Sequence, residues 1–338
     1  MRIYQVIQRV CPTLALVSGF SGGASPPPQV VTHSTASRAM TAVERHGRLG
    51  VRGNRIVDEH GDAVQLRGMS LFWSQWMPQY YNERALRWLR DDWNVSVVRA
   101  AMAVPSGGYL KHPDVETAKV EAVIDAAVKL GIYVIVDWHA HDPAPDVAQL
   151  FFSRIAARYG ALPNIIYEPW NEPLERYDWR TVIKPYHMVV IAAIRARDTS
   201  NLIVAGTPTW SQDVDIAAAD PLPFANVAYT LHFYAGSHRQ ALRDKAEKAM
   251  ARGAALMVTE WGTGSADGNG TLDTIETRKW LDFMDRHTLS WANWSVADKN
   301  ETTAALLPGA SGTGGWTSAQ LSASGTLVRE ELRRHGQP

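Results

Sequence analysis

Two glutamates, Glu172 and Glu260, stand at the ends of short apolar runs that predict β-strands. Glu172 lies in the stretch YEPWNEP, residues 167–173, where Pro169 and Pro173 cannot donate to a sheet ladder, so a strand must finish there. Paired carboxylates flanking a bond are what glycoside hydrolysis requires, because one protonates the leaving oxygen and the other attacks or activates water. A gap of about 5–5.5 Å between them would mean retention of anomeric configuration, and a wider gap inversion. Sequence alone does not give that distance.

An alternation of strands and helices would have to position these carboxylates. The clearest helical pattern runs from about Val115 to Leu130 and ends before Gly131, where a left-handed cap is expected. We therefore expect an α/β fold, a single (β/α)8 TIM barrel closed by a helix over residues 322–334. A doubly wound sheet is the rival, but the first strand lacks a Gly-rich phosphate loop. The expected strands are Val64–Leu71, Ser96–Ala100, Tyr133–His139, Ile165–Glu172, Leu202–Pro208, Val227–Tyr234, Leu256–Trp261 and Ser290–Ser295.

Polar and aromatic side chains crowd the C-terminal ends of these strands, where barrel enzymes carry their reactive groups. A single histidine or arginine at such a position can simply be satisfied by its neighbours, but the whole set argues for a functional rim. The residues are Arg99, His139, Asn171, Glu172, Trp210, His232, Tyr234, Glu260 and Trp294.

The composition is typical of a globular protein, with 46% hydrophobic and 20% charged residues. The 34 basic residues balance the 34 acidic ones, which argues against nucleic acid or an anionic membrane surface as partner. No apolar run reaches about 18 residues, so we expect no membrane span. Cys11 is the only cysteine, so no disulfide can form within one chain, and we expect a monomer.

The N-terminal residues differ in texture from the rest of the chain. Arg2 and Arg9 precede a modest apolar run and then small residues, which resembles a secretory signal peptide; a disordered leader or a misassigned start codon is the alternative. We expect secretion to the extracellular space or the periplasm. The expected parts are a signal peptide over 1–24, a Pro/Ser/Thr-rich disordered leader over 25–42 and a catalytic domain over 43–338.

Eight motifs at the expected strand ends carry a family resemblance that covers residues 47–335. In chain order they are LRGMSLFWSQW, VVRAAM, VIVDWHAH, PNIIYEPWNEP, GTPTWSQDVD, LHFYAG, VTEWGT and LSWANWS. Together they resemble the strand-end motifs of glycoside hydrolase family 5, and most closely those of its bacterial endoglucanases.

The resemblance implies a role for each central residue. Glu172, in NEP, would be the general acid/base, and Glu260, in TEWG, the nucleophile of a retaining double displacement. Arg99 would favour the ionised form of Glu260, whereas Glu172 would have to stay protonated to act as an acid. Tyr234 would hydrogen-bond the nucleophile, and Asn171 would bind the sugar 2-hydroxyl.

The remaining site residues would surround the sugars. By resemblance, His139 and His232 would complete the shell around the reacting sugar. Trp76 would serve a distant glycone subsite, Trp210 a leaving-group subsite and Trp294 the sugar next to the cut, since flat aromatic faces stack on pyranose rings. Other tryptophans, at positions 88, 93, 138, 170, 280 and 291, are better explained by packing.

Four positions bear on the glycone side. Lys299 and Glu301, in DKNE, match positions that hydrogen-bond glycone-side hydroxyls, although a solvated charged loop explains them equally well. Phe72 and Ala103 depart from the pattern, because many relatives carry a histidine and a tyrosine there. These departures put the fine substrate preference in doubt, but not the reaction.

Several other polar residues near the expected strand ends could be taken for catalytic or metal-binding groups. Glu168 is best explained as a hydrogen-bond partner inside the barrel, with Glu172 favoured as the acid, and Asp137 also suggests a structural role. The stretch HAHD, with His141 and Asp142, could be mistaken for a metal cluster, but no further ligand is evident and the inferred chemistry needs neither a metal nor a cofactor.

The sequence thus predicts an endo-β-1,4-glucanase that cuts soluble or amorphous cellulose with retention. A β-mannanase or a mixed-linkage β-glucanase is the alternative within the family. A non-catalytic glycan-binding barrel is the alternative of another class, and the presence of both glutamates, with Arg99 and Tyr234, argues against it.

Overall fold

The computed structural model describes residues 15–16 and 39–335. Most of the expected signal peptide and most of the expected leader lie outside the described residues. The compact unit that carries the fold runs over Met40–Pro338. Thr41 caps helix α1 (Ala42–His46), so residues 40–42, which we had expected in the leader, belong to this unit.

The predicted (β/α)8 barrel is confirmed, because eight parallel strands close a ring in which β10 pairs with β3. A two-stranded hairpin, β1 (Gly50–Arg52) and β2 (Arg55–Val57), precedes the barrel. The barrel strands are β3 (Arg67–Leu71), β4 (Val97–Ala103), β5 (Tyr133–His139), β6 (Ile165–Glu168), β7 (Leu202–Ala205), β8 (Val227–Tyr234), β9 (Leu256–Gly262) and β10 (Trp291–Val296).

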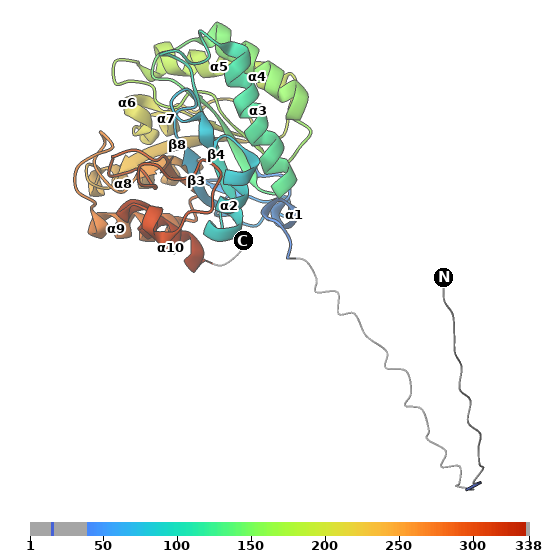
Figure 1. Ribbon diagram of the computed structural model, residues 1–338. Helices are drawn as coiled ribbons and strands as arrows, with labels where there is room; N and C mark the ends of the chain where they lie inside the picture. The colour runs from blue at the N-terminus through green and yellow to red at the C-terminus, as the bar shows by residue number, and fades with distance from the viewer. Residues whose placement is uncertain (1–14, 17–38, 336–338) are drawn as a thin grey trace. The chain divides into compact units, whose positions relative to one another are not determined.

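Helices surround the barrel, and α10 lies beside α2, where it completes the outer ring (Figure 1). Arg329 on α10 donates to both carboxylate oxygens of Asp92 on α2, at 2.7 and 2.8 Å. The helices are α2 (Glu83–Trp93), α3 (Pro113–Leu130), α4 (Pro145–Tyr159), α5 (Lys184–Arg195), α6 (Pro208–Ser211), α7 (Val214–Ala219), α8 (Gln240–Ala251), α9 (Thr274–His287) and α10 (Ala323–Arg334). Three short turns of helix, η1 (Pro78–Tyr80), η2 (Trp179–Ile183) and η3 (Ser318–Gln320), lie in the connections.

Alternate residues of each strand face the barrel interior, and their character changes along the strand. On β5, Tyr133 and Ile135 belong to an apolar cluster inside the barrel, and Asp137 and His139 follow at the same two-residue period. The intervening Val134 and Val136 belong to the core between strands and helices. The fold therefore puts an apolar plug at one end of the barrel and buried polar groups at the other.

Strand β6 is shorter than predicted, because it ends at Glu168 instead of Glu172. Pro169 follows directly and has no N–H to continue the ladder. The backbone nevertheless stays against β5, because the amides of Asn171 and Glu172 donate to the carbonyls of Trp138 and Ala140, at 3.1 and 3.2 Å. These two contacts hold Asn171 and Glu172 at the barrel rim.

Candidate active site

Arg99 on β4 is fully buried and joins the polar groups inside the rim. Its Nη1 donates to Oε2 of Glu260 at 2.9 Å, and its Nε donates to Oε2 of Glu168 at 2.7 Å. Its Nη2 donates to Oδ1 of Asn171 at 2.6 Å and lies 3.0 Å from Oδ2 of Asp137. One guanidinium therefore orients Glu260 and Asn171 while its charge is balanced by buried carboxylates. The structural roles predicted for Glu168 and Asp137 are consistent with these contacts.

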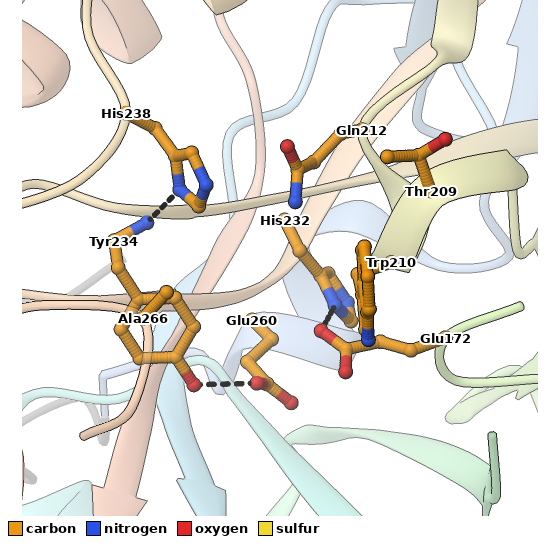
Figure 2. Close-up of a pocket in the computed structure, with 9 residues that line it drawn as sticks. All are labelled: Glu172, Thr209, Trp210, Gln212, His232, Tyr234, His238, Glu260 and Ala266. Atoms are coloured by element: carbon orange, nitrogen blue, oxygen red, sulfur yellow. Dashed lines mark hydrogen bonds and ion pairs between the residues drawn. The ribbon is translucent and has the colours of Figure 1, made fainter. Parts of the chain in front are cut away.

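The two glutamates singled out from the sequence face the same cavity (Figure 2). Side-chain oxygens of Glu172 and Glu260 and a ring nitrogen of His232 all lie within 4.8 Å of one another. Tyr234 donates its hydroxyl to Oε1 of Glu260 at 2.7 Å, so both oxygens of that carboxylate receive a hydrogen bond. The rim thus holds one carboxylate fixed by Arg99 and Tyr234, opposite a second carboxylate.

Glu172 is held by two histidines, one on each oxygen. Nδ1 of His232 lies 2.9 Å from Oε1, and Nε2 of His141 lies 3.1 Å from Oε2. Burial favours the neutral carboxyl, but the two histidines outweigh it and lower the pKa of Glu172 to about 2. The two histidines therefore favour the ionised form of Glu172, whereas the acid step would need its carboxyl protonated.

Glu260 shows the opposite shift. Burial and the negative charge of Glu172 raise its pKa above the ordinary value of 4.5, against the opposing effects of His232, Arg99 and Tyr234. Arg99 therefore favours the ionised form of Glu260, but burial and the charge of Glu172 outweigh its effect.

The two strand-end histidines are in different charge states. Burial opposes a charged ring at His232, but Glu260, Glu168 and Glu172 raise its pKa to about 9. Burial and the charge of Arg99 lower the pKa of His139 well below its ordinary value, so this ring is neutral. Nδ1 of His139 lies 2.6 Å from Oδ2 of Asp137, which orients the ring.

The cavity beside the glutamates has a volume of about 390 Å³. Trp210, which is 38% exposed, forms the wall of the cavity next to Glu172 (Figure 2). The lining residues are Glu172, Thr209, Trp210, Gln212, His232, Tyr234, His238, Glu260 and Ala266.

Trp210 is presented by a left-handed turn that is unusual for residues with side chains. Thr209, Trp210 and Ser211 have φ values of 57°, 52° and 57°. The amide of Trp210 donates to the carbonyl of Pro173 at 2.9 Å, and the hydroxyl of Ser211 donates to the carbonyl of Asn171 at 2.7 Å. The turn that carries the indole is therefore fastened to the segment that carries Glu172.

The other predicted sugar platforms lie in a second aromatic group. Trp76 is 56% exposed, and its ring lies 6.2 Å from that of Phe72, which in turn lies 5.2 Å from the ring of Trp294. Trp294 is 5% exposed and stacks on His139, with ring centroids 5.1 Å apart and planes 2° apart. This aromatic group adjoins the polar groups at the barrel rim through His139.

Phe72 and Ala103, the two departures from the family pattern, are buried, and Lys299 packs on Phe72. Nζ of Lys299 lies 4.7 Å from the centroid of the Phe72 ring and forms an ion pair with Glu301. Glu301 also accepts from the hydroxyl of Thr303 at 2.9 Å. Ala103 is fully buried. Lys299 thus lies against the aromatic group of Phe72, Trp76 and Trp294, and neither Lys299 nor Glu301 lines the cavity beside Glu172.

The six tryptophans for which packing was the better explanation belong to the core or pack against it. Those at positions 93, 138, 170, 280 and 291 are at most 1% exposed, and Trp88 packs against the same core. Asp142, from the HAHD stretch, accepts hydrogen bonds from Arg176 and Tyr177.

Sequence reasoning missed His141, His238 and Gln212. His141 was considered only as a metal ligand, although its position two residues after His139 placed it at the same strand end. Nδ1 of His238 accepts from the amide of Tyr234 at 2.9 Å, in the turn directly after β8. Gln212 comes two residues after Trp210. Proximity to a predicted rim residue was the available signal in each case.

Two groups of side chains among the described residues have the spacing of a metal site. One is Glu172, His232 and Glu260, the carboxylate cluster itself. The other is Asp285, Glu331 and His335, at the outer ends of α9 and α10. There, Arg278 and Arg334 already approach Oε2 of Glu331, each at 2.8 Å.

Comparison with known families and sequences gives consistent results. Residues 57–300 match the cellulase family, glycosyl hydrolase family 5. The chain is 44% identical to Endoglucanase N of Pectobacterium atrosepticum over 98% of its own length and 74% of that protein. It is 49% identical to Endoglucanase A of Evansella cellulosilytica over 90% of its own length and 63% of that protein.

Solved structures resemble the barrel closely. A protein from Cytophaga hutchinsonii is 54% identical, with a TM-score of 0.87 over 88% of this chain and 97% of the other. A variant of the catalytic domain of Thermobifida fusca endoglucanase Cel5A, solved in complex with cellotetraose, is 36% identical. It aligns with a TM-score of 0.83 over 87% of this chain and all of the other.

Proposed function

Because the chain belongs to the cellulase family, glycosyl hydrolase family 5, we propose that it is a retaining endo-β-1,4-glucanase with Glu172 as acid/base and Glu260 as nucleophile. In the first step, an oxygen of Glu260 attacks the anomeric carbon while the carboxyl of Glu172 protonates the leaving oxygen. In the second step, Glu172 takes a proton from water, and that water displaces Glu260 from the sugar.

The separation of the two carboxylates is the observation that carries the proposal. Oxygens of Glu172 and Glu260 lie within 4.8 Å of each other. Retaining enzymes hold their carboxyl groups about 5–5.5 Å apart, whereas inverting enzymes need roughly 6.5–9.5 Å to admit a water molecule. The short gap therefore supports direct attack by Glu260 and retention of configuration.

The environment of each carboxylate supports its role. Glu260 receives hydrogen bonds from Arg99 and Tyr234, which fix its direction and stabilise negative charge when the glycosyl bond to it breaks. Glu172 faces Trp210, the aromatic wall proposed for the leaving group, so it lies on the side where a departing sugar needs a proton.

Asn171 is suited to hold the sugar 2-hydroxyl. Its Oδ1 accepts from Arg99, which fixes the orientation of the amide, and it is 1% exposed. Its Nδ2 is buried without a partner among the residues that the structure describes. A donor left free in this way can bind the 2-hydroxyl, a contact that strengthens at an oxocarbenium-like transition state.

The proposed substrate is a soluble or amorphous β-1,4-glucan. The relative solved with cellotetraose supports a glucan chain. Trp210 beside Glu172, and the separate aromatic group that adjoins His139, can stack on different sugars of that chain. Chain on both sides of the cut is what internal cleavage requires. His139 and His232 would border the reacting sugar, and Trp76 and Trp294 would serve the glycone side.

Reducing-sugar release tests the proposal directly. The purified protein is assayed on carboxymethylcellulose, mixed-linkage β-glucan, mannan and xylan, with Glu260→Ala as the blank, and the anomer first formed is identified by proton NMR. Release of the β-anomer from the cellulose derivative, absent in the variant, is expected. A preference for mannan would contradict the proposed substrate. No release from any of the four polymers, with binding intact, would favour a glycan-binding barrel.

We also propose that the chain is secreted. The N-terminal sequence and the family of bacterial endoglucanases support this, because cellulose lies outside the cell. None of the described helices is long and apolar enough to cross a bilayer. Expression of the full chain in a bacterial host, with N-terminal sequencing of the protein in the medium and the periplasm, tests for cleavage near residue 24.

A further inference from the structure

The two histidines that hold Glu172 differ in their access to solvent. The side chain of His232 is 2% exposed, and its Nε2 lies 2.9 Å from Oγ1 of Thr259, which fixes the ring. The side chain of His141 is 37% exposed and belongs to the loop between β5 and α4. Oε1 of Glu172 is therefore held by an immobilised ring, and Oε2 by a ring in contact with solvent.

We infer that His141 acts through Glu172: it supplies the catalytic proton to Oε2 of Glu172 and takes it back in each turnover. The inference rests on the hydrolytic function proposed above. In the first half-reaction, the Nε2–H bond of the His141 imidazolium breaks and an O–H bond forms on Glu172, which then protonates the glycosidic oxygen. In the second, Glu172 removes a proton from the attacking water and returns it to His141.

The arrangement resolves a conflict between the role of Glu172 and its charge. An acid catalyst must carry a proton, yet the contacts of Glu172 with His141 and His232, at 3.1 and 2.9 Å, favour its ionised form. The pKa of His141 is raised, because burial is outweighed by its contact with Glu172. The ion pair of imidazolium and carboxylate is one proton transfer away from neutral imidazole and carboxylic acid. A substrate that expels water from the cavity favours the neutral pair, since charge separation costs more at low dielectric.

The surroundings of His141 suit a ring that changes charge. The negative charges of Glu172, Glu260 and Asp142 all raise the pKa of His141. Asp142 also forms an ion pair with Arg176. The groups that act on His141 directly are Trp73 on the β3–η1 connection, His139 on β5, Asp142 beside it, Glu172 after β6 and Glu260 on β9. Arg176 pairs with Asp142, and His232 on β8 contacts Glu172.

The test compares His141→Gln with the wild type on two aryl β-cellobiosides. Glutamine keeps an N–H that can reach Glu172 but carries no transferable proton. Dinitrophenolate leaves without protonation, whereas phenolate needs an acid, whose full contribution is about 10²- to 10⁴-fold. We expect kcat/KM on phenyl β-cellobioside to fall about tenfold or more, and that on 2,4-dinitrophenyl β-cellobioside to stay within about twofold. The alkaline limb of the pH profile should move to lower pH.

Controls separate this inference from a structural effect and from the proposed function. His60→Gln makes the same substitution at a histidine that is 63% exposed after the β1–β2 hairpin, and it should behave as wild type. His141→Ala removes the hydrogen bond as well. If His141→Gln keeps the leaving-group dependence and the alkaline limb of the wild type while His141→Ala loses them, His141 only orients Glu172. That result would overturn the proposed proton transfer. An inactive wild type, by contrast, would contradict the proposed function itself.

Discussion

Tyr234 donates its hydroxyl to Oε1 of Glu260 at 2.7 Å, while Arg99 donates to Oε2 of the same carboxylate at 2.9 Å. The phenol is nearly buried, so its hydrogen bond competes little with water. Because two donors come from different strands, the carboxylate is fixed in direction before any substrate arrives. This preorganisation suits the nucleophile proposed above, whose charge would have to disappear and return within one catalytic cycle.

Tyr234→Phe should therefore slow catalysis without unfolding the protein. A hydrogen bond to a charged group contributes about 1.5–3 kcal/mol, which corresponds to a loss of roughly 10- to 100-fold in kcat. Steady-state kinetics on carboxymethylcellulose, with the thermal midpoint as control, checks this. A variant with unchanged kcat would show that the phenol is dispensable for the nucleophile.

The acid limb of the pH profile should report Glu260. Its pKa lies above 4.5 because of burial and the nearby charge of Glu172, and the nucleophile must be ionised, so kcat/KM should fall as the pH drops through a value above 4.5. Glu172→Gln removes the neighbouring charge, so the pKa of Glu260 should drop. Carbon-13 NMR titration of labelled glutamate in both proteins measures the change. An equal or higher pKa in the variant would mean that Glu172 does not act on Glu260.

Glu168 should matter for stability before it matters for the chemistry. It is fully buried and accepts from Arg99 at 2.7 Å and from Thr259 at 2.6 Å. Removing one partner of a buried ion pair costs about 3 kcal/mol or more, because the other charge is left uncompensated. Glu168→Ala should lower the denaturant midpoint accordingly, and Glu168→Gln less so, since the amide oxygen still accepts. A stable but inactive Glu168→Ala would instead make Glu168 a candidate for the acid.

The sequence predicts the barrel and its polar rim for a single physical reason. Inward-facing positions recur every second residue, so a strand such as Tyr133–His139 displays its change from apolar to polar directly in the sequence. Strands β5 and β8 (Val227–Tyr234) have the bounds that were predicted. Neither strand contains a proline or a glycine that would interrupt the pattern.

What the sequence leaves open are contacts made by loops and charges set by their surroundings. His141 meets Glu172 across 31 residues of chain, and no local pattern encodes that meeting. The pKa of a carboxylate depends on the sum of burial and all nearby charges, so the order of the shifts at Glu172 and Glu260 required the positions of His232 and Arg99.

Trp210 and Trp76 should shift the position of the cut in opposite directions. If Trp210 binds the leaving group and Trp76 a distant glycone sugar, loss of either weakens binding on one side only, by about tenfold for one stacked ring. Trp210→Ala should therefore move cleavage of cellopentaose toward its reducing end, because fewer sugars then need to lie on the leaving-group side. Trp76→Ala should move it toward the non-reducing end. Hydrolysis in oxygen-18 water with mass spectrometry of the products gives the distribution, and shifts in the same direction would contradict both assignments.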